Sequence, residues 1–192
     1  MEKLNKILII YLIIIGAGFL VFNSIYNLNE NQEFSLETVV GINSKKIVDV
    51  EREIIFDTIA DIENYPIILP KNIIDVKIIN QTTSAGGANV IMVEQKVSEA
   101  GVISTILVKH DILPYTSHKI EIMEGDAKGT IIRANFDEKE KQTEITIEAE
   151  IHLHGILAPF GLLTQKNMES ALNTMIDSFI EYAKVNNPRL ET

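Results

Sequence analysis

Two histidines near the end of the chain have a spacing that a metal site could use. His152 and His154 are separated by one residue, so in a strand both side chains lie on the same face. Imidazole nitrogens are common ligands of transition metals. That face also carries Glu148 and Glu150, so we expect it to be the solvated one, and the sequence assigns no third ligand. We therefore interpret the pair as surface residues and predict no metal site.

A third histidine is expected to face the interior. His110 alternates with Ile106, Val108 and Ile112, which is the period of a strand with one buried face. It is either a core residue satisfied by a neighbour or by water, or a general acid or base. Asp111 follows it directly and points to the opposite face, so the two form no ready-made dyad. No second acid–base group converges on His110, and we predict no catalytic residue.

The composition excludes several kinds of chemistry. The 192 residues contain no cysteine, which excludes disulfides, thiolate nucleophiles and cysteine-ligated zinc. With 17 basic and 27 acidic residues the formal net charge is −10, and no basic patch is available to neutralise phosphates, so nucleic acid is not an expected partner. The G-x-S-x-G, Walker, Rossmann and H-E-x-x-H motifs do not occur, and we predict no cofactor.

Alternation of apolar and polar residues predicts seven strands. The clearest is 142–154, whose odd positions from Ile145 to Leu153 are apolar while its even positions are polar. This pattern is typical of an antiparallel sheet with one face in water. In 72–81 the same pattern places Ile74, Val76 and Ile78 on one face. The predicted strands are 39–50, 72–81, 89–98, 102–113, 118–124, 129–136 and 142–154, and their short links indicate a single antiparallel meander.

Helical spacing predicts two short helices within 51–69 and one long helix over 159–184. The long helix carries an apolar stripe from Met168 to Ala183 at i, i+3, i+4 spacing. The fold class is therefore α+β: a curved seven-stranded antiparallel sheet wrapped around a long C-terminal helix, with two short helices after the first strand. A curved sheet and a single helix rarely fill the space between them, so we expect an apolar cavity there.

One stretch carries a family resemblance. Residues 49–79 read DVEREIIFDTIADIENYPIILPKNIIDVKII. The pattern of a strand, an acidic helix, D-x-x-x-Y-P and a second proline falls on Val48, Val50, Ile55, Phe56, Asp61, Tyr65, Pro66 and Pro70. With the element order, it resembles the START-like helix-grip superfamily (SRPBCC), of the polyketide cyclase/dehydrase and lipid-transport type, over about 42–184. This resemblance implies an apolar ligand held between the C-terminal helix and the sheet.

The expected cavity is lined by the sheet on one side and by the long helix on the other, and an apolar loop connects the last strand to that helix. Its candidate residues are Ile91, Val93, Gln95, Ile106, Val108, His110, Ile132, Ala134, Ile147, Ala149, Met168, Leu172, Met175 and Phe179. Gln95 and His110 are the polar groups that would orient a ligand. The link 155–163 is unusually apolar for a loop, so Ile156, Leu157, Phe160 and Leu162 either pack on the core or form a membrane-facing gate.

The N-terminus predicts a membrane anchor. Residues 7–29 carry no charge, and about 23 helical residues span roughly 34 Å, enough to cross a hydrocarbon core of about 30 Å. Lys3 and Lys6 precede the span, which places the N-terminus in the cytoplasm and the rest outside. A cleaved signal peptide and a buried helix are the alternatives. The expected organisation is a cytoplasmic segment 1–6, a transmembrane signal anchor 7–26, a polar tether 27–37, a START-like domain 38–186 and a tail 187–192.

Together these features predict a membrane-anchored binder or transporter of a lipid or other hydrophobic small molecule. Two alternatives remain open. One is a cyclase/dehydrase-type enzyme acting on a hydrophobic substrate, with His110 or a tyrosine as general acid or base. The other is a structural or interaction module whose core is filled and binds no ligand. The fold by itself does not decide among them.

Overall fold

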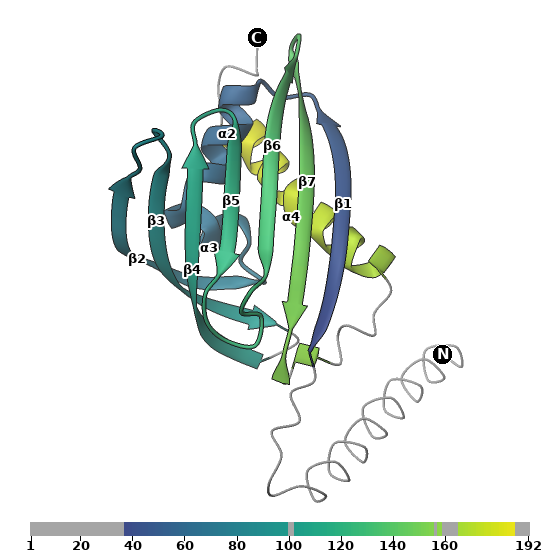
Figure 1. Cartoon of the computed structure of the whole chain (residues 1–192). Helices are drawn as coiled ribbons and strands as arrows, with labels where there is room; N and C mark the ends of the chain where they lie inside the picture. The colour runs from purple at the N-terminus through teal and green to yellow at the C-terminus, as the bar shows by residue number, and fades with distance from the viewer. Residues whose placement is uncertain (1–36, 100–101, 156, 159–164, 187–192) are drawn as a thin grey trace, which may run out of the picture. The chain divides into compact units, whose positions relative to one another are not determined.

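The computed structural model describes residues 37–99, 102–155, 157–158 and 165–186. In chain order they form β1 (Thr38–Val48), α2 (Arg52–Ala60), η1 (Ile62–Asn64), α3 (Tyr65–Ile68), β2 (Ile73–Thr83), β3 (Asn89–Glu99), β4 (Val102–Leu113), β5 (Ser117–Ile122), β6 (Ile131–Lys139), β7 (Gln142–Leu153) and α4 (Gln165–Asn186). Seven strands, short helices after the first and a long C-terminal helix confirm the predicted element order (Figure 1). The chain divides into two units, residues 1–35 and 36–192, and every described element belongs to the second.

The seven strands form one antiparallel sheet, in the order β1-β7-β6-β5-β4-β3-β2. Strands β2 to β7 follow one another as a meander, but β1 pairs with β7 and not with β2. The predicted single meander is therefore wrong at its first connection. The reason is that α2, η1 and α3 carry the chain from one edge of the sheet to the other before β2 begins (Figure 1).

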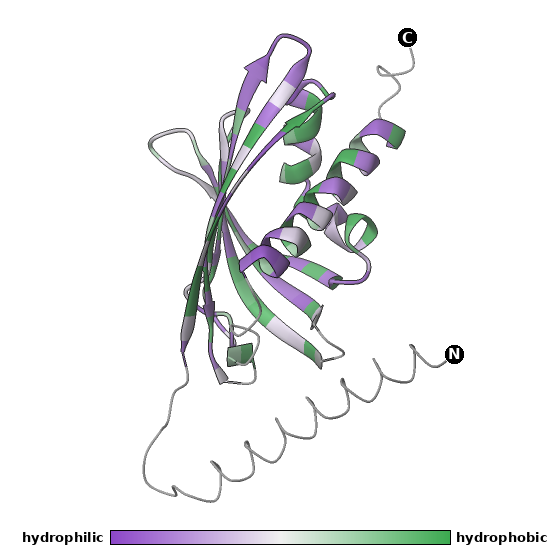
Figure 2. Ribbon diagram, turned by 90° about the vertical axis from the view of Figure 1, so that its right-hand side faces the viewer, coloured by the Kyte–Doolittle hydropathy of each residue, from purple (hydrophilic) through white to green (hydrophobic). Residues whose placement is uncertain are grey.

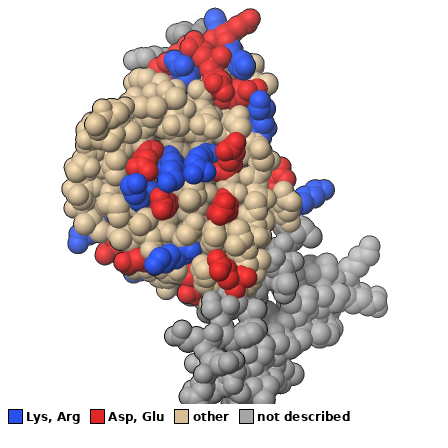
Figure 3. Space-filling model, viewed as in Figure 1, with Lys and Arg blue, Asp and Glu red and all other residues tan. Residues whose placement is uncertain are grey.

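The two faces of the sheet differ as the alternation predicts. Val93 and Ile145 on the inner face are 0% exposed, and they belong to the apolar core. On the outer face Lys109 Nζ lies 3.0 Å from Asp111 Oδ2. Figure 3 looks onto this outer face and shows basic and acidic side chains mixed across it. The sheet therefore has one dry and one wet side, as the period-two pattern requires.

The helices lie on the inner side of the sheet (Figure 2). The long helix α4 buries Ile176, Phe179, Ile180 and Ala183, the stripe that its 3.6-residue period predicts. At the sheet edge Ser44 Oγ of β1 donates to Asn173 Oδ1 of α4 at 3.1 Å, and Lys46 forms an ion pair with Asp177. These contacts hold the helix against the first strand. The predicted start of the helix at 159–164 lies outside the described residues.

The predicted face of β2 holds for Val76 and Ile78, which pair with the inner-face residues Gln95 and Val93, but it is wrong at Ile74. Ile73 is buried, whereas Ile74 and Ile78 are 41% and 36% exposed. Register shifts occur between Ile73 and Asp75 and again after Ile78. Each shift inserts an unpaired residue, and because side chains alternate with period two, one extra residue moves the following side chains to the opposite face. Simple alternation therefore fails at the two register shifts of this edge strand and holds between them.

The predicted membrane anchor, residues 7–26, and most of the predicted tether lie outside the described residues. Among the residues that the structure describes, no helix is long and apolar enough to cross a bilayer.

Candidate ligand-binding cavity

A cavity of about 480 Å³ lies between the inner face of the sheet and α4. Pockets of about 300–1,000 Å³ are typical of small-molecule sites. Strands present every second side chain to this space, and α4 contributes one face. The apolar walls include Val108, Ile132 and Ile147 from the sheet and Met175 and Phe179 from the helix.

The structure brings most of the predicted cavity residues together. The lining includes Gln95, Ile106, Val108, His110, Ile132, Ala134, Ile147, Leu172, Met175 and Phe179. Four others do not line it. Ile91, Val93 and Ala149 are 8%, 0% and 6% exposed, because the inner face continues past the cavity into packed core, and Met168 is half-buried in the first turn of α4.

Several lining residues were not predicted. Ile120 and Ile122 enter from β5, and Gly125, Asp126 and Ala127 from the loop after it. The signal for the first two was present, because they alternate on a strand in the same way as the predicted residues. The loop residues have no periodicity, so only the tertiary structure places them at the cavity.

A buried polar network of Gln95, His110 and His118 reaches the cavity wall through Gln95 and His110. His110 and His118 are 0% and 1% exposed, and His110 Nδ1 lies 2.9 Å from His118 Nε2. The amide nitrogen of Gln95 lies 3.4 Å from His110 Nε2. His118 pairs with Ile112 of β4 across the sheet, so the two histidines are diagonal neighbours on one face. Sequence reasoning missed His118, although Ile120 two residues later marks the same inward face.

The hydrogen bonds couple the proton positions of the two rings, which leaves two arrangements. When Gln95 donates to His110 Nε2, His110 Nδ1 carries the proton and donates to His118 Nε2, so that His118 is protonated on Nδ1. That Nδ1 has no hydrogen-bond partner among the described residues. With the Gln95 amide turned over, every donor and acceptor is exchanged and His118 Nδ1 is still unpaired. A buried polar atom without a partner costs about 1–3 kcal/mol.

Burial keeps both histidines neutral. It lowers the pKa of His110 to about 3, with a smaller contribution from the neighbouring His118. Burial also lowers the pKa of His118 to about 4, against a smaller raising effect of Asp111. Charging either ring would place a cation in a position that water hardly reaches. At neutral pH the pair therefore offers hydrogen bonds and not charge.

Tyr65 contributes an aromatic surface rather than a free hydroxyl. Its ring lies edge-on to Phe179, with centroids 5.3 Å apart, and to His110 at 6.1 Å. Its phenol donates to the Ile59 carbonyl at 2.7 Å, and burial raises its pKa above the ordinary value. The tyrosine therefore keeps its proton and closes the end of the cavity near α4.

The predicted gate is only partly described. Leu157 lines the cavity and donates its amide to the His154 carbonyl at 2.9 Å. Ile156, Phe160 and Leu162 lie outside the described residues. The second predicted feature of this region, the pair His152 and His154, lies on the outer face and does not line the cavity.

No protein-family model and no curated protein matches this chain. Solved structures of the helix-grip type do. The protein TTHA0849 from Thermus thermophilus matches with a TM-score of 0.63 and 13% identity, over 76% of this chain and 98% of that one.

Two further structures extend this finding. The Zhui aromatase/cyclase from Streptomyces sp. R1128 has a TM-score of 0.57 and 16% identity, over 76% of this chain and 94% of its own. A START superfamily protein from Mycobacterium smegmatis has a TM-score of 0.53 and 14% identity, over 79% and 97%. At these identities the likeness shows the fold alone, and it agrees with the predicted helix-grip fold.

Proposed function

We propose that this protein is a membrane-anchored binder or carrier of a lipid or other hydrophobic small molecule. The observation that carries the proposal is the cavity of about 480 Å³ between sheet and helix, with mainly apolar walls. Apolar burial would supply the affinity and a few polar groups the orientation. Gln95 and His110 are the candidates for that orientation, because both are buried in the cavity wall.

Solved structures with this fold support a small-molecule ligand for this chain. One of them is titled norcoclaurine synthase from Thalictrum flavum in complex with dopamine and hydroxybenzaldehyde, with a TM-score of 0.54 and 15% identity, over 79% of this chain and 90% of that one. The ligand class proposed for this chain comes from its own lining, in which apolar side chains predominate.

Membrane attachment belongs to the proposal and rests on sequence. The charge-free stretch 7–29 would anchor the chain, with Lys3 and Lys6 on the cytoplasmic side and the domain on the other. A tether of about a dozen residues lets the domain reach the bilayer surface. The apolar link 155–163 would then be the entrance for the ligand, and Leu157 at the cavity wall supports this.

Binding ranks ahead of catalysis because of the state of His110 and Tyr65, the groups that the cyclase-type alternative would use. A general base works best when its pKa lies near the operating pH, and burial lowers the pKa of His110 to about 3. Tyr65 has its proton engaged by the Ile59 carbonyl. The cyclase-type alternative would need His110 to exchange a proton with substrate, so His110→Gln would abolish turnover while leaving binding largely intact.

The direct test is the ligand content of the full chain purified from membranes in detergent. Small molecules are extracted and quantified per protein chain. We expect one species at near-stoichiometric amount, lost in Ile106→Asp and Met175→Asp, which place a charge in the cavity wall. Matched controls are Ile103→Asp on the outer face of the same strand and Val185→Asp on α4, because these residues are 59% and 80% exposed. Equal content in all five proteins would contradict the proposal.

A further inference from the structure

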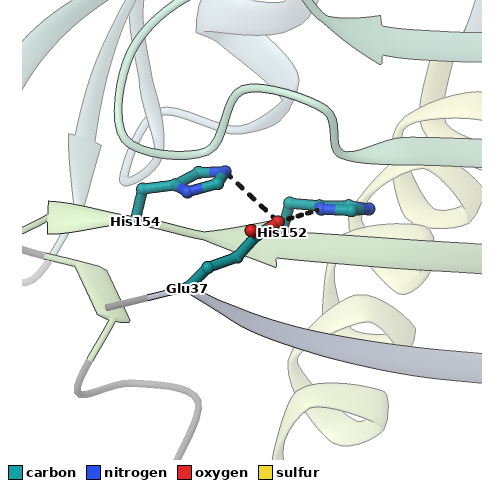
Figure 4. Close-up of side chains that lie close together, drawn as sticks. All are labelled: Glu37, His152 and His154. Atoms are coloured by element: carbon teal, nitrogen blue, oxygen red, sulfur yellow. Dashed lines mark hydrogen bonds and ion pairs between the residues drawn. The ribbon is translucent and has the colours of Figure 1, made fainter. Parts of the chain in front are cut away.

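A cluster of possible metal ligands forms where β1 begins and β7 ends. Glu37, His152 and His154 each offer one ligand atom, and these atoms all lie within 4.8 Å of one another. Figure 4 shows the three side chains converging at the sheet edge. Glu37 supplies the third donor that the sequence did not assign to the two histidines.

Strand pairing explains the convergence. Val39 pairs with His152 and Thr38 with Leu153, so Glu37 lies one register step further, opposite His154. Residues opposite or diagonal to one another on one face of an antiparallel pair are side-chain neighbours. The chain separation of Glu37 from His152 is 115 residues, which is why no local motif marks the site.

The distances suit a transition metal. His152 Nδ1 lies 3.0 Å and His154 Nε2 4.0 Å from Glu37 Oε1. Around tetrahedral zinc, with bonds of about 2.0–2.2 Å, ligand atoms lie about 3.3–3.5 Å apart. The side chains of Glu37, His152 and His154 are 48%, 20% and 31% exposed, so small rotations can close the difference.

The surroundings resemble the outer shell of a metal site. The other nitrogen of His152, Nε2, lies 2.8 Å from Glu150 Oε1, the carboxylate–histidine arrangement that orients metal-bound imidazoles. The backbone of His152 forms two hydrogen bonds with Thr130 Oγ1, at 2.9 and 3.1 Å. His154 Nε2 hydrogen-bonds to the Lys128 carbonyl at 3.0 Å, and ligation through that nitrogen would replace this bond.

We propose that Glu37, His152 and His154 bind one divalent transition-metal ion, which ties the start of β1 to the end of β7. Two imidazoles and one carboxylate are a donor set found in zinc sites, with water completing the coordination. Imidazole ligands favour zinc and its first-row neighbours over magnesium and calcium. The site lies on the outer face of the sheet and is separate from the apolar cavity.

The test uses the untagged full chain in detergent, since a polyhistidine tag would itself bind the probe. Zn²⁺ is titrated by calorimetry, with native mass spectrometry for stoichiometry. We expect one Zn²⁺ per chain, binding weakened about 100-fold or more by Glu37→Gln, His152→Gln or His154→Gln, and about tenfold by Glu150→Gln. Glu144→Gln is the matched control, because this carboxylate lies on the same face of β7 and pairs with Lys45 at 2.9 Å. The Zn²⁺ affinity of Glu144→Gln is expected to equal that of the wild type.

A second measurement avoids dependence on variants. A metal ion that binds the folded chain but not the unfolded chain raises the Tm. We therefore expect the Tm to rise with Zn²⁺ and not with Mg²⁺. In the His152→Gln/His154→Gln double variant we expect no rise with Zn²⁺. Three outcomes would overturn the proposal. They are the absence of stoichiometric Zn²⁺, unchanged Zn²⁺ affinity in the double variant, and an equal Tm rise with Mg²⁺, which would indicate diffuse binding to an acidic surface.

Discussion

The two histidine pairs of this sheet have opposite surroundings. His110 and His118 lie on the inner face, contact each other at 2.9 Å and are almost completely buried. His152 and His154 lie on the outer face, with Glu37 and Glu150 against the ring nitrogens of His152. Both pairs come from strands, so strand geometry alone does not distinguish them.

The opposite pKa shifts follow from these surroundings. Burial lowers the pKa of His110 and His118, whereas hydrogen bonds to Glu150 and Glu37 raise that of His152. The inner pair is a neutral hydrogen-bonding element, whereas His152 on the outer face has two carboxylates that favour its charged form. The partner atoms, and not the residue type, therefore decide which protonation state each of these histidines favours.

The largest difference in stability between the two pairs is expected when one histidine of each pair is replaced by aspartate. His118→Asp buries a carboxylate without a partner and should lower the free energy of unfolding by about 3–5 kcal/mol. His154→Asp, at a partly exposed site, should cost about 1 kcal/mol or less. Urea unfolding of both variants measures the difference. Equal losses would mean that the inner pair is more hydrated than its burial indicates.

The loss of stability as the pH falls below 6.5 should come from the inner pair, because His152, whose pKa is raised, contributes in the opposite direction. Because the folded pKa values of about 4 and 3 lie below the ordinary 6.5, unfolding takes up protons as the pH falls. The contribution of the two histidines to the free energy of unfolding is therefore complete above pH 6.5. It falls toward pH 4 by about 1.4 kcal/mol per pH unit for each proton that unfolding takes up. Urea unfolding at pH 7, 6 and 5 measures this slope, and the His110→Gln/His118→Gln variant should flatten it. An unchanged slope would assign the effect to other groups.

A glycine lies beside the outer histidine pair. Gly129 has φ +92, and an added Cβ would lie 3.4 Å from Cγ of His152. Gly129→Ala should lower the free energy of unfolding by about 1–3 kcal/mol, because the left-handed conformation strains a residue with a side chain, and it should also weaken Zn²⁺ binding. Gly41→Ala is the control, since an added Cβ there meets nothing within 4 Å. Comparable losses in both would contradict this account of Gly129.

The smallest effect on stability is expected from the ion pair of Lys119 and Glu121, which lies next to His118 in the chain but on the outer face of β5. Lys119 Nζ lies 2.8 Å from Glu121 Oε2, and both side chains are 28% exposed. Lys119→Gln should change the free energy of unfolding by about 0–1 kcal/mol, less at high salt, because water and ions screen such pairs. Thermal unfolding at low and high salt measures it. A loss comparable to that of His118→Asp would break the distinction between the two faces.

Much of the fold could be predicted because it is local in the sequence. The alternation from Ile145 to Leu153 defines two faces, and the structure buries the expected one. The stripe ending at Ala183 likewise predicts which side of α4 meets the sheet. Periodicity carries this information because side-chain direction is tied to backbone geometry, with period two in strands and 3.6 in helices.

The tertiary structure decided which of these faces meet. Register brought His118 beside His110 and placed Glu37 opposite the end of β7, and the irregular pairing of β2 exposed Ile74 against the simple pattern. The physical reason is that register and strand order depend on contacts between residues far apart in the chain. The sequence by itself therefore determined the faces of this protein, and the tertiary structure determined its sites.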